Sequence, residues 1–244
     1  MDDPIIMEYV KENVANVFAT DSIISLLMCS TRTIYPWDIV VTKDGDKIFL
    51  DRREENNDFF LLSVNESSPE APSSKDTSDI NGKFLLSREA TFIDLCFSQQ
   101  ATSSENPHTK PLVTFDQNPN IKDNSVAECA YFYKVWDLGD DIKILIRSEA
   151  NAAVQVKGDE EDYDIANVHT LNEFDPKSTE WKKKLDGQRG AVFARELKNN
   201  SGKISRWAVE SYLAEAQRTV LGFVTRSKER DRENHLVLGV QPIS

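Results

Sequence analysis

Apolar side chains follow the spacing of an amphipathic helix in two stretches of the first hundred residues. The first, SIISLLMC (22–29), comes directly after Thr20 and Asp21, and either residue can cap a helix N-terminus. The second, KFLLSREATFIDLCFSQQ (83–100), predicts a longer helix. We expect its core-facing side chains to be Phe84, Phe92, Leu95 and Cys96.

Strand-like runs with turn residues between them dominate much of the remaining chain. The runs WDIVV (37–41) and KIFLDRR (47–53) flank Asp44-Gly45, a pair that predicts a β-hairpin. Further strands are expected at residues 126–138, 141–150, 151–157, 164–174, 220–226 and 235–240.

The stretch RGAVFARELKNNSGKISRWAV (189–209) predicts a strand, a turn and then a helix. A short basic helix is expected just before it, around residues 180–185. In IKILIR, the alternate residues Ile142, Ile144 and Ile146 predict a strand with one buried face. Together these patterns predict a mixed α/β (α+β) domain built around a sheet.

Two long polar loops interrupt these elements. The first, residues 54–82, contains a short apolar core, FFLLSV, followed by a tail rich in Ser, Pro and Asp. Loops of this length are uncommon inside compact domains and are usually functional lids or disordered, so both interpretations stay open from the residues alone. The second loop, residues 101–124, contains Pro107, Pro111 and Pro119.

Composition agrees with a globular protein of one large domain or two small ones rather than with a membrane or secreted protein. The 244 residues are 39% hydrophobic and 29% charged, a balance that supports a substantial core. No apolar run approaches the roughly 20 residues that span a bilayer, and the acidic N-terminus lacks a signal-peptide apolar region. Cys29, Cys96 and Cys129 indicate buried thiols in a reducing compartment, and the three histidines lack zinc-ligand spacing.

Charge is distributed unevenly along the chain. The net charge of −12 argues against a general nucleic-acid coat protein, because phosphate binding needs cations. Residues 177–207, however, contain nine Lys and Arg against three Asp and Glu. This local excess indicates either a solvated basic face or a groove for a phosphodiester chain.

Glu196-Leu197-Lys198 is the main candidate for chemistry. On the predicted strand, Glu196 and Lys198 point to the same face, and Glu149 and Asp94 lie on elements that could join them. Two acids and a lysine at adjacent strand ends are the minimum for holding Mg²⁺ and activating water. The alternative is a surface ion pair. No G-x-S-x-G motif and no phosphate-cradling glycine loop is present in the sequence.

Aromatic side chains offer a second kind of candidate site. A methylated guanine carries positive charge, which favours contact with π faces. Aromatic residues in strands more often belong to the core, so both roles stay open. The candidates for stacking on a base are Tyr35, Trp37, Trp136, Trp181 and Trp207.

Several long segments of this chain resemble the d-subunit family of eukaryotic translation initiation factor three, and specifically its cap-binding domain. The resemblance runs from about residue 3 to about residue 241. The segments that carry it are NVFATDSIISLLMCSTRTIYPWDIVV, EATFIDLCFSQQ, KVWDLGDDIKILIRSEA, VHTLNEFD and LDGQRGAVFARELKNNSGKISRW.

This resemblance implies a single cap-binding domain over residues 1–244, with a two-sheet core flanked by helices and a fold similar to the decapping exonucleases. It also implies that a helix and hairpin found at the C-terminal end of the family's domain are absent here. The first long loop matches the family's RNA gate, which can cover an RNA-binding tunnel. The gate residues are Asp58, Phe59, Phe60, Leu61, Leu62, Ser63, Val64, Asn65, Glu66, Ser67, Ser68, Pro69, Glu70, Ala71 and Pro72.

The motifs of the related decapping enzymes are only partly retained. Their helical glycine-x-x-x-glutamate falls on residues 90–94, where the glycine is absent and Asp94 replaces glutamate. Their E-x-D falls on residues 149–151, where Asn151 replaces the second acid, and their E-x-K falls intact on residues 196–198. Hard divalent cations favour several carboxylates. We therefore expect a binding protein that is not an enzyme and has no metal or other cofactor.

The family's RNA-facing helices indicate where the RNA and its cap bind. The enzymes' upstream arginine is also missing, because it falls near Thr20-Asp21. The predicted RNA- and cap-binding residues are Asp21, Ile34, Tyr35, Thr91, Asp94, Leu95, Glu149, Glu196 and Lys198.

The resemblance also predicts partners and location. They are 5′-capped messenger RNA, the other subunits of the initiation factor complex and the small ribosomal subunit, in the cytoplasm and without a membrane. Two other functions remain as alternatives. One is a Mg²⁺-dependent RNA 5′-end decapping hydrolase, and the other is a purely structural scaffold subunit.

Overall fold

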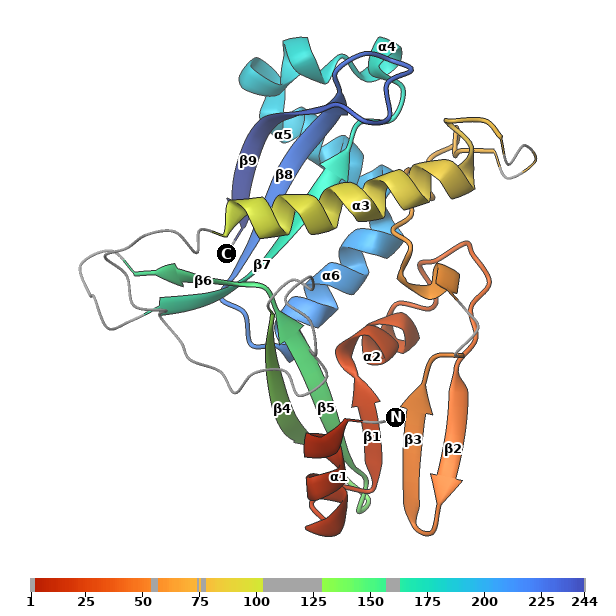
Figure 1. Ribbon diagram of the computed structural model, residues 1–244, viewed down its shortest axis with the longest axis vertical. Coiled ribbons are helices and arrows are strands. Elements are labelled where there is room, and N and C mark those ends of the chain that lie inside the picture. Colours follow the sequence, from red (N-terminus) through yellow and green to blue (C-terminus); the bar gives the residue numbers. More distant parts are fainter. Residues whose placement is uncertain are drawn as a thin grey trace.

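The computed structural model describes residues 3–53, 57–73, 75, 78–102, 129–156 and 163–243. Figure 1 shows two sheets, one above the other, with the helices between and around them. The helices are α1 (Pro4–Lys11), α2 (Asp21–Met28), η1 (Asn57–Phe60), α3 (Lys83–Ala101), α4 (Pro176–Thr179), α5 (Trp181–Asn199) and α6 (Ser201–Leu213). The strands are β1 (Val17–Thr20), β2 (Val40–Asp44), β3 (Lys47–Asp51), β4 (Ala130–Asp137), β5 (Lys143–Ala150), β6 (Ala152–Gln155), β7 (Tyr163–Asn172), β8 (Arg218–Arg226) and β9 (His235–Ile243).

The lower sheet has five strands in the order β2-β3-β1-β5-β4. Its centre, β1, runs parallel to both β3 and β5, whereas the two outer pairs are antiparallel. The predicted hairpin is confirmed as β2–β3, with Asp44 opposite Lys47. Gly45 in its turn has a φ of +57°, a conformation that glycine adopts without steric cost.

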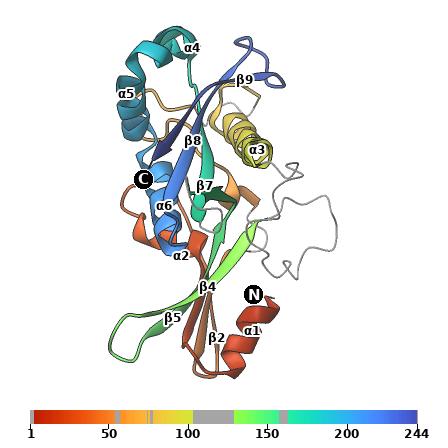
Figure 2. The same ribbon diagram turned by 90° about the vertical axis from the view of Figure 1, so that its left-hand side faces the viewer.

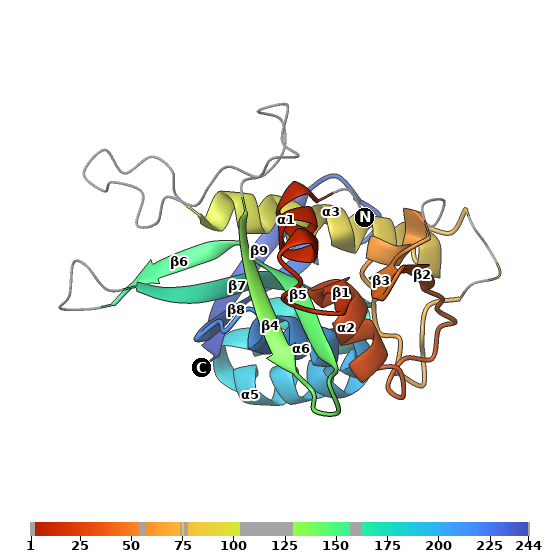
Figure 3. The same cartoon turned by 90° about the horizontal axis from the view of Figure 1, so that it is seen from below.

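Both faces of this sheet are covered, as Figure 3 shows with α1 on one side and α2 and α6 on the other. Leu145 is buried among residues of α1 and β1 on the first face. Ile144 and Ile146 are buried with Leu213 of α6 on the second. The predicted buried face of β5 is therefore correct at Ile144 and Ile146, but Ile142 is exposed.

The N-terminal helix α1 was not predicted from the apolar pattern. Asp3 caps it, because its carboxylate accepts hydrogen bonds from the backbone N–H of Ile5 and Ile6. The same carboxylate accepts from the Tyr133 hydroxyl and pairs with Arg147 at 2.7 Å. The cap thus also ties the helix to β4 and β5.

The upper sheet has four strands in the order β6-β7-β8-β9, with β7 and β8 parallel. Figure 2 shows α3 and α5 on opposite sides of β7, β8 and β9. Helix α3 approaches β8 closely, because a Cβ on Gly222 would lie 2.7 Å from the Phe97 ring. On the other face the buried cluster is Leu171, Trp181, Leu185, Val192, Trp207, Leu221 and Phe223.

The predicted strand in residues 189–209 is wrong, since this stretch is the end of α5 followed by most of α6. The buried residues of α5 fall at spacings of three, four and seven, and they are Trp181, Leu185, Val192, Glu196 and Asn199. This is the periodicity of a helix. The run AVFAR has a strand-like composition, but its burial follows the helical period.

The predicted core face of α3 is wrong, although the helix itself is confirmed. Leu86, Ala90 and Ile93 are buried, at the spacing of one helix face. The side chains assigned to the core that are exposed instead are Phe84, Phe92 and Leu95. Cys96 is half-buried.

A charged residue on the buried face of α3 made this face hard to recognise. Glu89 pairs with Arg226 at 2.6 Å and lies 2.8 Å from the His235 ring nitrogen. Although burial acts in the opposite direction, these hydrogen bonds hold the pKa of Glu89 below its ordinary value. The paired carboxylate is therefore accommodated against the sheet.

Some predicted segments lie outside the described residues. These are nearly all of the second long loop (103–124), the start of the 126–138 strand, and residues 54–56, 74, 76 and 77 of the first loop. Within the described ranges, no helix is both long enough and apolar enough to cross a bilayer.

Candidate functional site

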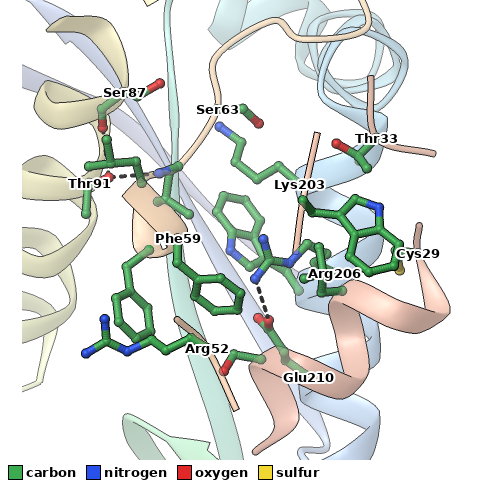
Figure 4. A pocket seen from close by; sticks show the side chains of 18 of the residues that line it. Cys29, Thr33, Arg52, Phe59, Ser63, Ser87, Thr91, Lys203, Arg206 and Glu210 are labelled. Carbon is green, nitrogen blue, oxygen red and sulfur yellow. Dashed lines mark hydrogen bonds and ion pairs between the residues drawn. The ribbon is translucent and has the colours of Figure 1, made fainter. Parts of the chain in front are cut away.

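A cavity of about 1090 Å³ opens where the two sheets meet. Its walls come from α2, α3 and α6, from β7 and the ends of β3, β4 and β5, from the loop after α2, and from the segment 59–66. Figure 4 shows Arg206 and Glu210 of α6 on one side and Thr91 of α3 on the other, with Phe59 between them.

An aromatic stack forms part of the cavity wall. The His169 ring of β7 lies parallel to the Trp207 indole of α6, with ring centroids 4.3 Å apart and an interplanar angle of 5°. Trp207 also belongs to the buried cluster beneath α5 and α6. The stack is therefore held rigidly by the core while its edge borders the cavity.

Lys203 is a buried cation beside this stack. Its Nζ lies 5.2 Å from the centroid of the Trp207 ring. Burial lowers the pKa of the ammonium to about 8, while Asp94, Glu196 and Glu66 act in the opposite direction. The cavity wall thus holds a cation that is poorly solvated by water.

Three carboxylates gather where α2, β5 and α6 meet. Asp21 accepts hydrogen bonds from the backbone N–H of Ser22 at 2.6 Å and of Glu149 at 2.8 Å. Glu210 accepts from the Ser25 hydroxyl at 2.6 Å. Burial, followed by the charges of Glu210 and Glu149, raises the pKa of Asp21 to about 7. Burial likewise raises the pKa of Glu149.

Asp94 on α3 is bound to β7. Its Oδ1 accepts from the backbone N–H of Thr170 at 2.5 Å and from the Thr170 hydroxyl at 3.1 Å. Its Oδ2 lies 3.3 Å from His169 Nδ1. Asp94 therefore joins helix to sheet and orients the imidazole of the aromatic stack.

Asn151, which is predicted to stand where the decapping enzymes have an acid, is engaged with β7. Its Nδ2 donates to the carbonyl of Val168 at 3.1 Å, and its Oδ1 accepts from the Val168 N–H at 2.8 Å. The amide uses both a donor and an acceptor, which a carboxylate could not do.

The segment 57–73, which contains the predicted gate, is attached to α3. The N–H of Leu62 donates to the Thr91 hydroxyl at 2.9 Å, a contact drawn in Figure 4. Val64 is buried against Leu86 and Ala90. The segment is therefore anchored to one wall of the cavity by both packing and a hydrogen bond.

The same segment is also attached to the junction of α5 and α6. The N–H of Asn65 donates to Asn200 Oδ1 at 2.9 Å, and the Ser67 hydroxyl donates to the Lys198 carbonyl at 2.6 Å. The N–H of Ser67 donates to the carbonyl of Asn199 at 3.0 Å. The segment thus bridges the two walls.

Most predicted site residues line the cavity. Ile34 and Lys198 are exposed outside it, and Glu196 is buried away from it. The predicted residues brought together at the cavity are Asp21, Tyr35, Thr91, Asp94, Leu95 and Glu149, with the gate residues Phe59, Phe60, Leu61, Leu62, Ser63 and Glu66.

The predicted pairing of Glu196 with Lys198 is wrong. On helix α5 the two side chains point in different directions, and Glu196 instead accepts a hydrogen bond from Asn200 Nδ2 at 2.9 Å. Burial raises the pKa of Glu196 to about 7. In the described part of the chain, no group of three or more His, Cys, Asp or Glu side chains could hold a metal ion.

Tyr35 meets a cation at the cavity. The Nζ of Lys83 lies 3.3 Å from the centroid of its ring. Burial, followed by the charge of Glu66, raises the pKa of the Tyr35 hydroxyl. The ring is therefore positioned in a partly desolvated environment at the edge of the gate.

The basic stretch 177–207 does not form one continuous groove at the cavity. In the described part of the chain, its members Lys203 and Arg206 line the cavity, and its other seven cations do not. Lys183, for example, pairs with Glu180 at the exposed start of α5.

Sequence reasoning missed His169, and it did not single out the cavity face of α6. Lys203, Arg206, Trp207 and Glu210 follow one another at spacings of three, one and three, so they share one helix face. The spacing of these four residues is visible in the sequence. Their shared helix face was overlooked because the residues just before them were predicted to form a strand.

Comparison with known sequences identifies the relatives of this chain. A family model described as eukaryotic translation initiation factor 3 subunit 7 (eIF-3) matches residues 1–244. The D-1 subunits of eukaryotic translation initiation factor 3 from Drosophila sechellia and from Drosophila melanogaster are each 44% identical over 247 residues. The matches cover 98% of this chain and 43% of those proteins, so the chain spans less than half of their length.

Solved structures with the same fold come from a different group of proteins. Rai1 of Scheffersomyces stipitis matches with a TM-score of 0.58 and 13% identity, over 100% of this chain and 55% of that one. Rai1 of Candida albicans in complex with pU5-Mn²⁺ matches with a TM-score of 0.56 and 12% identity, over 100% and 57%. The predicted fold, a two-sheet core similar to the decapping exonucleases, is confirmed.

Proposed function

The chain belongs to the eukaryotic translation initiation factor 3 subunit 7 family, and from this premise we propose that it binds the 5′ cap of messenger RNA. In this proposal the domain promotes cap-dependent initiation on selected messages. Its partners are 5′-capped messenger RNA, the other subunits of the initiation factor complex and the small ribosomal subunit, and it acts in the cytoplasm.

The single observation that carries the proposal is the combination of groups around the cavity. A 7-methylguanine has a positively charged ring, and the aromatic side chains of Tyr35, Phe59 and Phe60 line the cavity in which it would bind. Guanine also has N–H donors on its edge, for which Asp21 and Glu149 are suitable acceptors. Lys203 supplies positive charge for the phosphates.

The size of the cavity also supports a capped RNA end. Typical small-molecule pockets have volumes of about 300 to 1000 Å³. A cavity of about 1090 Å³ has room for a nucleotide with its phosphates and part of the next residue. It is open to solvent, so the following RNA can leave it.

Binding without hydrolysis is supported by the way the inherited motif residues are used. Asp94 is bound to Thr170, and the amide of Asn151 is bound to Val168. Glu196 and Lys198 lie on different sides of α5. These side chains hold elements together or lie elsewhere, which leaves the decapping hydrolase as the less favoured alternative.

The gate function is part of the proposal. Residues 58–72 would control access, because Phe59, Leu62 and Glu66 of this segment line the cavity. Removing the segment should raise cross-linking of capped RNA. If its removal lowers cross-linking, the segment belongs to the binding surface and the gate interpretation is wrong.

An equilibrium titration tests the cap-binding proposal. The 244-residue chain should bind 7-methylguanosine triphosphate at least about tenfold more tightly than guanosine triphosphate. Tyr35→Ala should weaken the binding of the methylated nucleotide, whereas Tyr212→Ala should not, because Tyr212 is exposed outside the cavity. Equal affinity for the two nucleotides would contradict cap recognition.

A further inference from the structure

Lys203 has no hydrogen bond and no ion pair for its ammonium group among the described residues. The residue is only 5% exposed. Its Nζ lies over the ring of Trp207, 5.2 Å from the ring centroid. Asp94, Glu196 and Glu66 attract this ammonium electrostatically, but none of them forms an ion pair with it, so a directly bound anion would offset more of the cost of burial. Because Lys203 lines the cavity, such an anion can reach it from there.

Glu66 of the segment 57–73 lies against the N-terminus of α6. Its Oε1 accepts a hydrogen bond from the backbone N–H of Lys203 at 3.0 Å. The side chain is buried, although it comes from a surface segment. Helix α6 has thirteen residues, and the dipole at such a helix start favours an anion. The N–H of Ser201 donates to the Ser67 hydroxyl, so Glu66 is held by the N–H of Lys203.

Residues on both sides of the contact between Glu66 and α6 favour it. A Cβ on Gly202 would overlap Oε1 of Glu66, so the carboxylate can lie there only against a glycine. Asn65 has a φ of 51°, the left-handed conformation that asparagine tolerates better than most residues. This turn directs Glu66 inward while the Asn65 N–H remains bonded to Asn200.

We infer that the start of α6 and the Lys203 ammonium form an anion subsite for a phosphate group of the RNA 5′ end, which Glu66 occupies as a carboxylate substitute. The inference rests on the proposed cap-binding function. It identifies Lys203 and the start of α6 as the phosphate contact, and Glu66 as the group that competes with phosphate. Phosphate binding and the seated position of Glu66 exclude one another.

A phosphate fits this subsite better than the carboxylate does. Glu66 makes its hydrogen bond to the backbone and none to Nζ of Lys203. A phosphate has more acceptor oxygens and more negative charge, so it can satisfy the backbone N–H of Lys203 and the ammonium together. Arg206, one turn further along α6, also lines the cavity and adds a second cation.

Displacement of Glu66 couples the phosphate to the position of the segment. Its neighbours Asn65 and Ser67 are bonded to Asn200 and Asn199, so withdrawal of the segment that carries Glu66 breaks these contacts as well. By linkage, anything that releases the segment raises the affinity for phosphate, and bound phosphate favours the released segment.

Pyrophosphate titration of the 244-residue chain tests the subsite without any RNA. Calorimetry would compare wild type, Glu66→Gln and Lys203→Met. The control variants are Glu233→Gln and Lys43→Met, which make the same charge changes at exposed positions outside the cavity. Glu66→Gln keeps the side-chain shape and removes the charge that competes with pyrophosphate.

We expect Glu66→Gln to bind pyrophosphate about tenfold more tightly than wild type, and Lys203→Met to lose most of the binding. The double variant should bind as weakly as Lys203→Met, and both controls should match wild type. Thermal unfolding of each variant verifies that it is folded. If Lys203→Met does not fold, the comparison of Glu66→Gln with Glu233→Gln still tests whether Glu66 competes with pyrophosphate for the subsite.

The same proteins, titrated with capped RNA, separate this inference from the proposed function. If Glu66→Gln binds pyrophosphate no better than Glu233→Gln does, the subsite is refuted, even when capped RNA binds and competes with free cap. If pyrophosphate binding follows the expected order but capped RNA binds to no variant, the subsite stands and the cap-binding function is wrong.

Discussion

Asn151 illustrates how one side chain at the cavity can serve the structure rather than chemistry. Its amide satisfies both backbone groups of Val168, with distances of 2.8 and 3.1 Å. An aspartate at this position could keep the acceptor but not the donor. The residue therefore fixes the end of β5 to β7 rather than adding charge to the cavity.

Asn151→Asp should destabilise the protein by about 1 to 3 kcal/mol, because it leaves the Val168 carbonyl facing a carboxylate. It should not create hydrolysis, since Asp94 remains bound to Thr170. Urea denaturation and release of labelled cap measure the two effects. If Asn151→Asp is as stable as wild type and releases labelled cap, the structural role given to the Asn151 amide is wrong.

Glu196 gives a pH-dependent contribution to stability. Burial raises its folded pKa from 4.5 to about 7, so the folded state holds a proton that the unfolded state has released between these values. The stability that this group contributes is present below pH 4.5 and is lost as the pH rises through about 7.

Glu196→Gln removes this titration. Relative to wild type, its free energy of unfolding should increase by on the order of 3 kcal/mol when the pH is raised from about 4.5 to about 8. Denaturant unfolding at several pH values measures the difference. A difference that is constant across this range would show that Glu196 does not titrate as its burial requires.

At single positions, the sequence predicted which acidic residues lie at the site better than it predicted which groups they contact. Asp21, Asp94 and Glu149 were expected at the site and line the cavity. The expected metal-site partner, Glu196, was misplaced because its strand is a helix. Which acid meets which backbone N–H depends on the packing of α3 against β7, and a local pattern does not contain that information.

The contact between the segment 57–73 and the start of α6 depends on a glycine. Gly202→Ala should expel Glu66, since the new Cβ would overlap its carboxylate. Limited proteolysis should then cleave the segment faster than in wild type. Gly190→Ala on α5 is the matched control, because a Cβ there meets nothing within 4 Å. Equal cleavage of both variants would refute the anchoring role of Glu66.

Helices and strands with a clear local period were predicted correctly. The α2 helix, the β2–β3 hairpin and the α3 helix are examples. Errors arose where tertiary packing overrides the local signal. Glu89 is buried on α3 because Arg226 and His235 pair with it, and Glu196 is buried on α5 beside Asn200. A polar residue on the buried face hides the helical period.

The basic stretch 177–207 contains nine cations, but it contributes only part of the positive charge at the cavity, where Arg52, Lys83 and Arg147 also lie. Lys203 and Arg206 are the members of this stretch at the cavity. The outer cations contribute to the surface of α5 instead. Phosphate recognition in this fold is therefore expected to be local and enclosed rather than spread over a basic face.

Salt dependence distinguishes these two arrangements. If Lys203 and Arg206 are the phosphate contacts, the logarithm of the binding constant should fall with the logarithm of salt concentration with a slope of about −1.4. A groove that used the whole basic stretch would give a slope of roughly −6. Titrations of capped RNA between about 50 and about 200 mM salt measure it. A steep slope would contradict the enclosed arrangement.

The cavity itself could not be predicted from local patterns. It forms where β5, β7, α2, α3 and α6 come together, and these elements are far apart in the sequence. The family resemblance supplied the two-sheet architecture that periodicity alone did not. The stacking of His169 on Trp207 follows from this tertiary arrangement, and the spacing of the two residues in the sequence does not predict it.

One experiment tests the central proposal most directly. RNA labelled at its 5′ cap is cross-linked to the 244-residue chain with Mg²⁺ or Mn²⁺ present, and cross-linking and released label are measured in the same tubes with excess cap analogue as competitor. We predict cross-linking that the analogue abolishes and no released label. Released label, or cross-linking that the analogue does not reduce, would contradict the assignment of this domain as a non-catalytic cap reader.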